Sequence, residues 1–222
     1  MTLPVSAGAA AAGVRRVVIV GAGGFGREMR FWARDAWGGA GVEFAGHLGA
    51  ATGRPDGTLR LLGEPDAHTP RDDEGFLLAI GIPGVRRRVA EDLASRGARF
   101  LTLVHPSAVV APTARIAAGA VICPGAVISD AAVVGPWALV NYHASVAHDA
   151  EVGAFAVLSP YATLAGRARA GADAFLGLHA SIGPGCTLGD RSKISANSCL
   201  LADAPPDSIV YGVPGRVGPL LP

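Results

Sequence analysis

The second half of the chain carries a six-residue hydrophobic pattern that repeats without an inserted residue. From Val104 to Cys199 the sequence divides into sixteen hexads, and the first position is Val, Ile or Leu in fifteen of them. The fifth position is Ala in thirteen hexads and Cys or Ser in the other three. A period of six fits neither a helix nor a simple strand alternation. It predicts coils of about 18 residues, each with three short strands and three turns, whose aliphatic positions point inward and whose small positions fill the narrow corners.

The first half of the chain shows a different pattern, in which apolar runs alternate with helix-like segments. An apolar strand over residues 15–20 leads into the Gly-rich turn 21–26, which opens a predicted helix over 27–37. Strands are also predicted over 42–48, 76–81 and 99–104, and a second helix over 83–96. This alternation predicts a small α/β domain with a parallel sheet. We therefore expect a flexible Ala/Gly-rich extension at residues 1–13, an α/β domain at 14–103 and the repeat domain with its C-terminal tail at 104–222.

The Gly-rich turn between strand and helix is a candidate phosphate site. Such a turn presents backbone N–H groups and the positive end of a helix dipole to an anion. Dinucleotide binding also calls for an acidic residue at the end of the second strand, where this sequence has Gly49 and Ala50. A nucleotide or nucleotide-sugar phosphate is therefore favoured over NAD, and a purely structural turn stays open as an alternative.

Composition agrees with the repeat and excludes several classes of protein. The 222 residues include 42 Ala and 31 Gly but only 6% aromatics, as narrow corners require. No run approaches the roughly 18 apolar residues of a membrane helix, so we expect no membrane insertion. With 19 basic and 18 acidic residues, a nucleic-acid partner is not expected either. The three cysteines form no CxxC pair and no secretion signal is evident, which predicts free thiols in the cytoplasm.

Several strings extend the comparison to a known family. VVIVGAGGFGRE, FLLAIGIPGVRRRVAEDL, VAHDAEVGAF and PPDSIVYGVPGRV resemble the sialic acid O-acetyltransferase and UDP-4-amino-sugar N-acetyltransferase family (NeuD/PglD-like). The resemblance spans residues 14–217. It implies a Rossmann-like α/β domain joined to a left-handed parallel β-helix, assembled as a homotrimer with active sites between adjacent prisms. It also implies acetyl-CoA as donor and an amine, less readily a hydroxyl, of a nucleotide-linked sugar as acceptor.

The same resemblance assigns the catalytic residues. His148 matches the family's general base and Asp149 the acid that polarises it. The chemistry is reasonable in itself, because an amine that attacks a thioester must lose a proton and a neutral imidazole accepts one near pH 7. A neighbouring carboxylate fixes the imidazole tautomer.

The resemblance also implies binding residues, with some departures from the family pattern. Those matching acetyl-CoA contacts are Gly166, one 18-residue coil after His148, together with Val157, Leu178 and Ala196. Candidates for the acceptor are Gly23, Gly24, Phe25, Gly81 and His143. No metal is expected. Phe25 and Val157 stand where the family often has His, and Gly49 and Ala50 where it often has an Asp pair that binds uracil. The nucleotide, the sugar, the acyl chain and N- versus O-transfer therefore stay open.

Two alternatives remain besides the acetyltransferase. A γ-type carbonic anhydrase shares the repeat, and the spacing of His143 and His148 resembles two of its zinc ligands, but Ser107 occupies the matching position for the third. A non-catalytic β-helix scaffold is the other. We further expect His47, His68 and His105 at the surface or at strand ends, and Trp137 on the outside of the prism.

Overall fold

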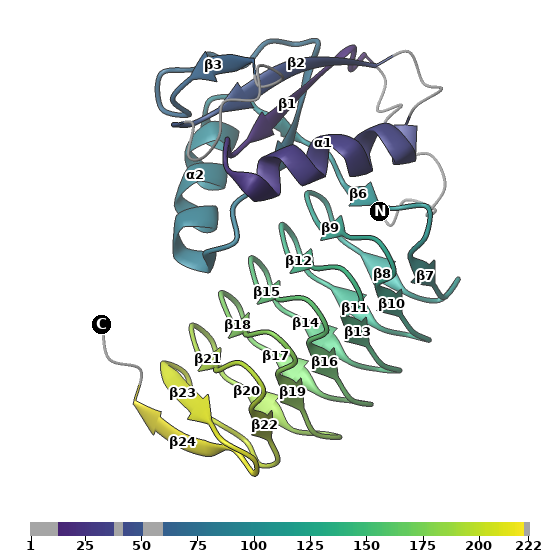
Figure 1. Cartoon of the computed structure of the whole chain (residues 1–222), viewed down its shortest axis with the longest axis vertical. Coiled ribbons are helices and arrows are strands. Elements are labelled where there is room, and N and C mark those ends of the chain that lie inside the picture. Colours follow the sequence, from purple (N-terminus) through teal and green to yellow (C-terminus); the bar gives the residue numbers. More distant parts are fainter. Residues whose placement is uncertain (1–12, 38–41, 51–59, 220–222) are drawn as a thin grey trace.

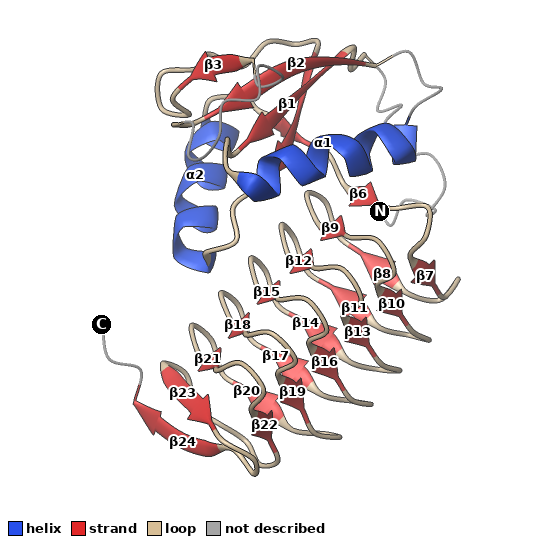
Figure 2. Cartoon of the chain, viewed as in Figure 1, coloured by secondary structure: helices blue, strands red, loops and turns tan. Residues whose placement is uncertain are grey.

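The computed structural model describes residues 13–37, 42–50 and 60–219. The predicted flexible extension therefore lies outside the described residues, apart from Gly13. The chain forms an α/β part and a parallel β-solenoid whose successive coils lead away from it (Figures 1 and 2). Within the described residues, no helix has the length and apolarity to cross a membrane.

The α/β part is a five-stranded parallel sheet in the order β3-β2-β1-β4-β5, with two helices. Its elements are β1 (Arg16–Val20), α1 (Gly24–Trp37), β2 (Glu43–Leu48), β3 (Leu61–Gly63), β4 (Glu74–Leu78), α2 (Pro83–Ser95) and β5 (Arg99–Phe100). The sequence pattern predicted each of these except β3, a three-residue edge strand without a hydrophobic run.

Alternate residues of β1 place the two helices on opposite faces of the sheet. Val17 and Ile19 are buried in one cluster with Met29 and Ala33 of α1, and this cluster continues into the solenoid. Val18 and Val20 are buried in another with Ala90 and Leu93 of α2. α1 therefore lies between the sheet and the first coils, as Figure 1 shows.

The predicted strand over residues 99–104 is wrong as a single element. The chain forms β5 in the α/β sheet, breaks at Leu101 and Thr102, and then forms β6 (Leu103–Val104) in the solenoid. The break arises because the two short strands pair with different neighbours, β4 and the first coil of the repeat.

The solenoid has three parallel faces, each built from two-residue strands. The covered face, named for the α/β part that lies on it, contains β6, β9 (Val121–Ile122), β12 (Leu139–Val140), β15 (Val157–Leu158), β18 (Phe175–Leu176) and β21 (Lys193–Ile194). It is closed by β23 (Ser208–Tyr211) and the antiparallel β24 (Arg216–Pro219). The second face contains β7 (Val109–Val110), β10 (Val127–Ile128), β13 (Ser145–Val146), β16 (Thr163–Leu164), β19 (Ser181–Ile182) and β22 (Cys199–Leu200). The third contains β8 (Arg115–Ile116), β11 (Val133–Val134), β14 (Glu151–Val152), β17 (Arg169–Ala170) and β20 (Thr187–Leu188).

The register confirms the predicted 18-residue coil. Ser145 pairs with Thr163, and Thr163 with Ser181, so equivalent residues of consecutive coils lie side by side. The aliphatic first and small fifth positions form one continuous buried cluster, in which most members have no exposed surface. The fourth position of many hexads has a positive φ. Its N–H donates to a carbonyl of the preceding coil, as from Asp149 to Asp130 at 3.0 Å, which offsets the strain of this backbone conformation.

The fourth positions define three corners of the prism. The first corner, after the covered face, carries His143, Tyr161, His179 and Asn197; the second carries Asp149 and Arg167; the third carries Trp137, Phe155, Asp173 and Arg191. The first and third corners border the covered face, whereas the second does not.

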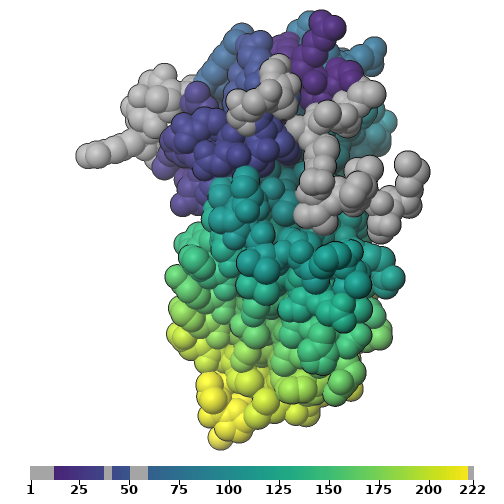
Figure 3. All heavy atoms as spheres, turned by 90° about the vertical axis from the view of Figure 1, so that its right-hand side faces the viewer, coloured from purple at the N-terminus to yellow at the C-terminus, as the bar shows by residue number. Residues whose placement is uncertain are grey.

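The α/β part is fixed to the covered face and the third corner. Trp137 lies on the outside of the prism at the third corner, where it stacks on Phe155 at a centroid distance of 5.0 Å and packs against Phe100 of the α/β part. Arg86 of α2 is fully buried and donates from Nε to the Trp137 carbonyl at 2.6 Å. The space-filling view shows the α/β part seated directly on the first coils, with the later coils below (Figure 3).

Candidate active site

His148 and Asp149 form a hydrogen-bonded pair at the second corner. Nδ1 of His148 lies 2.9 Å from Oδ2 of Asp149, and each side chain is 56% exposed. Because a carboxylate can only accept, Nδ1 is the donor in this arrangement, which leaves Nε2 as the ring nitrogen that can accept a proton. A base with a free lone pair at an accessible corner is suited to remove a proton from a bound substrate.

Gly166 keeps the space beside this base open. A Cβ on Gly166 would lie 2.5 Å from Nε2 of His148, closer than any ordinary contact. The Arg167 N–H also donates to the His148 carbonyl at 3.0 Å, which fixes the two coils together. The imidazole therefore lies over Gly166 in the next coil, as the 18-residue register predicts.

The other predicted acetyl-CoA residues occupy different places. Leu178, 49% exposed, and Ala196, also exposed, lie at the first corner in consecutive coils. Val157 is only 2% exposed and belongs to the cluster between the covered face and the α/β part. Its side chain presents no surface to a ligand in this chain.

The Gly-rich turn lies where the order of the α/β sheet reverses. The chain leaves β1 toward β2 on one side and β4 toward β5 on the other, so β1 and β4 are the strands at the switch point. In open parallel sheets the crevice at the carboxyl ends of such strands is the usual ligand site. Gly23 precedes α1 and Gly24 is its first residue, with Phe25 half-buried against Trp32. Close approach also explains Gly21, where a Cβ would lie 2.4 Å from the Ala79 carbonyl oxygen.

His47 forms a hydrogen bond with the start of this turn, although its sequence position indicated only a surface or strand-end residue. It is near the end of β2 but 2% exposed, and its Nδ1 donates to the Gly21 carbonyl at 3.1 Å. Burial lowers the pKa of His47, and the positive charges of Arg30 and Arg27 act in the same direction. The side chain is therefore neutral near pH 7 and restrains the Gly-rich turn.

The loop after β4 forms the other side of the switch point. Gly81 is exposed, and a Cβ there would meet no atom within 4 Å. Arg86 holds this loop with two hydrogen bonds from Nη1, to the Leu78 carbonyl at 2.8 Å and the Ile80 carbonyl at 2.9 Å. Burial lowers the pKa of Arg86 to about 9, so the side chain still carries its charge at neutral pH. Sequence reasoning missed this role because three arginines follow one another, and nothing in the pattern shows which is buried.

His143 belongs to a ladder of rings at the first corner. Its imidazole stacks on Tyr161 at 5.1 Å, and Tyr161 stacks on His179 at 4.8 Å. His143 and His148 therefore lie at successive corners of one coil, separated by the second face. In the described part of the chain, no three or more His, Cys, Asp or Glu side chains are grouped so as to hold a metal ion.

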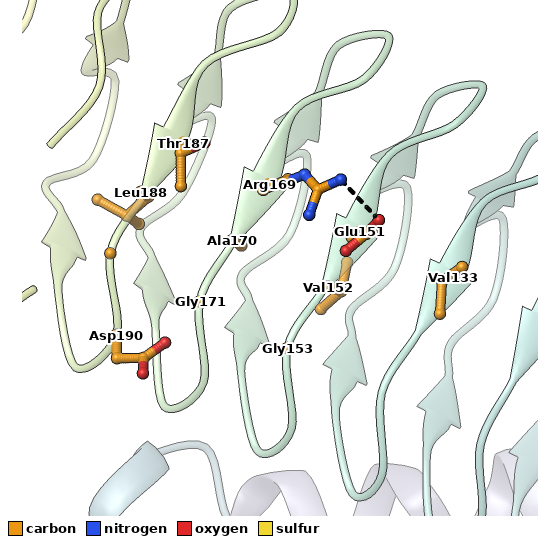
Figure 4. A pocket seen from close by; sticks show the side chains of 11 residues that line it. Val133, Glu151, Val152, Gly153, Arg169, Ala170, Gly171, Thr187, Leu188 and Asp190 are labelled. Atoms are coloured by element: carbon orange, nitrogen blue, oxygen red, sulfur yellow. Dashed lines mark ion pairs between the residues drawn. The ribbon is translucent and has the colours of Figure 1, made fainter. Parts of the chain in front are cut away.

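Two hollows accompany these residues. One, of about 290 Å³, lies over the third face, where Glu151 and Arg169 from neighbouring strands form an ion pair at 3.1 Å (Figure 4). Its charged pair is satisfied, and it contains none of the predicted site residues. The other, of about 490 Å³, lies between α2 and the solenoid, next to the loop that carries Gly81.

Solved structures share this architecture over nearly the whole chain. The acetyltransferase domain of PglB from Neisseria gonorrhoeae FA1090 has 28% sequence identity and a TM-score of 0.83, covering 91% of this chain and 98% of that one. It has also been solved with acetyl coenzyme A. PerB from Caulobacter crescentus, solved with CoA and GDP-perosamine, has 27% identity and a TM-score of 0.79, covering 94% and 98%. No family model and no curated protein matches the chain.

The chain is a hexapeptide-repeat acetyltransferase, similar in structure to enzymes of the NeuD/PglD-like type. WeeI from Acinetobacter baumannii AYE, at 21% identity and a TM-score of 0.81, has the same fold, and here 91% of this chain and 99% of that chain are covered. In this acetyltransferase, the imidazole–carboxylate pair and the switch point of the α/β sheet lie on different sides of one chain. The switch point belongs to the α/β part, which is seated on the covered face and the third corner, whereas His148 lies at the second corner.

Proposed function

We propose that this acetyltransferase transfers the acetyl group of acetyl-CoA to an amine of a nucleotide-linked sugar, with His148 as general base. The amine nitrogen attacks the thioester carbonyl carbon, and Nε2 of His148 takes the proton that the nitrogen loses. The new C–N bond forms as the C–S bond breaks, and the proton passes to the departing sulfur, so that CoA leaves as a thiol. A hydroxyl acceptor requires the same proton transfers.

The observation that carries this proposal is the His148–Asp149 pair beside Gly166. Asp149 holds the proton on Nδ1 and stabilises the imidazolium that forms, while Gly166 leaves Nε2 accessible. The donor and acceptor classes come from the similar structures, since the PglB domain was solved with acetyl coenzyme A and PerB with CoA and GDP-perosamine. Variants of the perosamine enzyme with one histidine replaced by Asn or Ala have been solved with the same two ligands.

The acceptor is proposed to bind at the switch point of a Rossmann-like domain, residues 14–103. The amides of Gly23 and Gly24 bind phosphate there, with Phe25 and Gly81 beside it and His143 as a further contact. Gly49 and Ala50 offer no carboxylate to a nucleobase. Recognition of the nucleotide therefore differs from recognition by an Asp pair.

The donor is proposed to lie along the second domain, residues 104–222, as a left-handed β-helix. Gly166 is at the second corner, but Leu178 and Ala196 are at the first, across a full face of the prism. Contacts from both corners are satisfied most directly if adjacent chains contribute one each, as in a homotrimer with a cleft between prisms. We place this trimer in the cytoplasm.

A thiol-release assay with a panel of nucleotide-linked amino sugars, and free amines as controls, tests the proposal. We expect His148→Ala to lower kcat by roughly 10²–10⁴-fold. Acetyl-CoA binding and the oligomeric state should be unchanged. Near-wild-type turnover in this variant would remove His148 from its role. Stoichiometric zinc in the purified protein would favour a carbonic anhydrase-like enzyme, and failure of acetyl-CoA to bind would favour a scaffold.

A further inference from the structure

The cavity of about 490 Å³ between α2 and the solenoid has lining residues that no role above accounts for. Ile82, Pro83, Gly84 and Arg87 come from the start of α2, and Asp173, Phe175, Arg191, Ser192 and Lys193 from the third corner and covered face. Ile82, the first of these lining residues, directly follows Gly81. The two parts of the chain therefore build it together, next to the crevice in which the acceptor is proposed to bind.

The charges around this cavity are unevenly paired. Arg87 forms an ion pair with Asp173 at 2.7 Å, and Arg191 one with Asp207 at 2.7 Å. Lys193 instead lies with its ammonium 5.5 Å from the centre of the Phe175 ring, and among the described residues it has no carboxylate partner. Lys193 is also the only lysine among 19 basic residues. One unpaired cation therefore faces a cavity that other basic side chains only border as neutral pairs.

Apart from Ser192, whose hydroxyl donates to the Pro205 carbonyl at 3.0 Å, the rest of the lining is apolar. Ile82 is 65% exposed, and the half-buried Phe175 ring lies beneath the Lys193 ammonium. Ligand sites of this kind combine an apolar surface with a few polar groups that fix orientation. Here the apolar surface suits the flat side of a sugar ring, and the single ammonium suits an oxyanion attached to it.

The cavity is also within reach of the phosphate turn. Gly21 approaches Ala79 so closely that a Cβ would lie 2.4 Å from the Ala79 carbonyl oxygen. From Ala79 to Ile82 the chain advances three residues, which span at most about 10 Å. An acceptor whose nucleotide lies at the Gly-rich turn can therefore extend along this loop into the cavity.

We propose that the cavity binds the glycosyl end of the acceptor and that Lys193 there binds an oxyanion of it. This inference rests on the proposed function and narrows its substrate class. The oxyanion is either a carboxylate on the sugar or the phosphate that joins the sugar to the nucleotide.

Because Lys193 is the only lysine, it can be observed directly. Reductive methylation with ¹³C-formaldehyde keeps its charge and gives one lysine NMR signal besides that of the N-terminal amine. The probes are UDP, GDP, UDP-glucose, UDP-glucuronate and CoA. A shift of the lysine signal that UDP or GDP already produces, without a sugar attached, identifies phosphate as the oxyanion. A shift that only UDP-glucuronate produces identifies the sugar carboxylate. A signal that none of the sugar nucleotides or diphosphates moves, or that only CoA moves, would overturn the proposal.

Matched variants separate charge from fold. Lys193→Met should weaken binding of the responding probe about tenfold, or roughly 1.4 kcal/mol, whereas Lys193→Arg should keep it. Arg88→Met is the control, because Arg88 is exposed on α2 but does not line the cavity. Equal binding by Lys193→Met and wild type, or equal weakening in Arg88→Met, contradicts the assignment. If the wild-type protein binds acetyl-CoA but no sugar nucleotide or diphosphate shifts the Lys193 signal, only the proposed role of the cavity is refuted. Failure to bind acetyl-CoA would instead refute the proposed function.

Discussion

At the scale of single residues, the decisive feature is that Gly166 has no side chain where it faces the His148 imidazole. Its Nδ1 is held by Asp149, and the far edge of the ring faces Gly166, where even a methyl group would lie 2.5 Å from Nε2. Gly166 does not have a positive φ, so alanine is compatible with its backbone. A substitution at this glycine therefore tests the position of the base without changing the base itself.

We expect Gly166→Ala to displace the imidazole and lower kcat by roughly tenfold or more, because even a small misplacement of reacting groups raises the activation barrier. The midpoint of thermal unfolding should change little, since the ring is exposed and can rotate away. Steady-state kinetics and a thermal melt on the same preparation measure both quantities. Unchanged kcat in a correctly folded Gly166→Ala protein would show that the ring seen beside Gly166 is not in its working position.

At the scale of elements, α2 is held to the solenoid by an unusual contact. Arg86 is fully buried and donates to the carbonyls of Leu78, Ile80 and Trp137. It thereby connects the end of β4, the loop that follows and the third corner. Arg87 adds an ion pair to Asp173 on the outside of the same junction.

Arg86→Met should lower the free energy of unfolding by about 2–4 kcal/mol, because three buried or partly buried carbonyls lose their donor. Arg88→Met, on the exposed side of α2, should change it by less than about 0.5 kcal/mol. Urea unfolding followed by circular dichroism compares the two variants with wild type. Equal stability of the two variants would mean that Arg86 does not hold the junction.

These elements also show what sequence alone could and could not predict. The solenoid was predictable because every hexad repeats the same local requirement, an aliphatic residue inward and a small one at the corner. The α/β strands and helices, apart from the edge strand β3, followed from their own hydrophobic patterns. The split between β5 and β6, the contact of Trp137 with the α/β part, the burial of Arg86 and the Lys193 cavity were not predictable. Each depends on how the α/β part sits on the prism, and no periodicity encodes that contact.

The candidate site also contains some residues that the sequence predicted and others that it did not. His148 and Asp149 are neighbours in sequence, and Gly166 follows one coil later, so a repeat of known period brings them together. The support that His47 gives to Gly21 spans 26 residues and two strands, and it had no sequence signal.

At the scale of the whole molecule, one chain does not bring its own Gly-rich turn, the proposed acceptor site, to its own His148. The α/β part covers the face opposite the second corner, where His148 lies. If the active site forms between adjacent chains of a closed ring, each site takes His148 from one chain and the Gly-rich turn from the next. This arrangement makes a quantitative prediction for mixtures of inactive variants.

The two variants to mix are His148→Ala and Gly24→Glu. Gly24 is the exposed first residue of α1, so a glutamate there suits the helix N-terminus while its carboxylate repels the acceptor phosphate. Each variant alone should be nearly inactive. After joint unfolding and reassembly in equal amounts, one half of the chains carries an intact base and the other half an intact turn. A random ring then has both at about one quarter of its interfaces, and thiol release should recover to about that fraction of wild type. If base and turn of the same chain formed the site, every site would contain a lesion and the mixture would stay inactive.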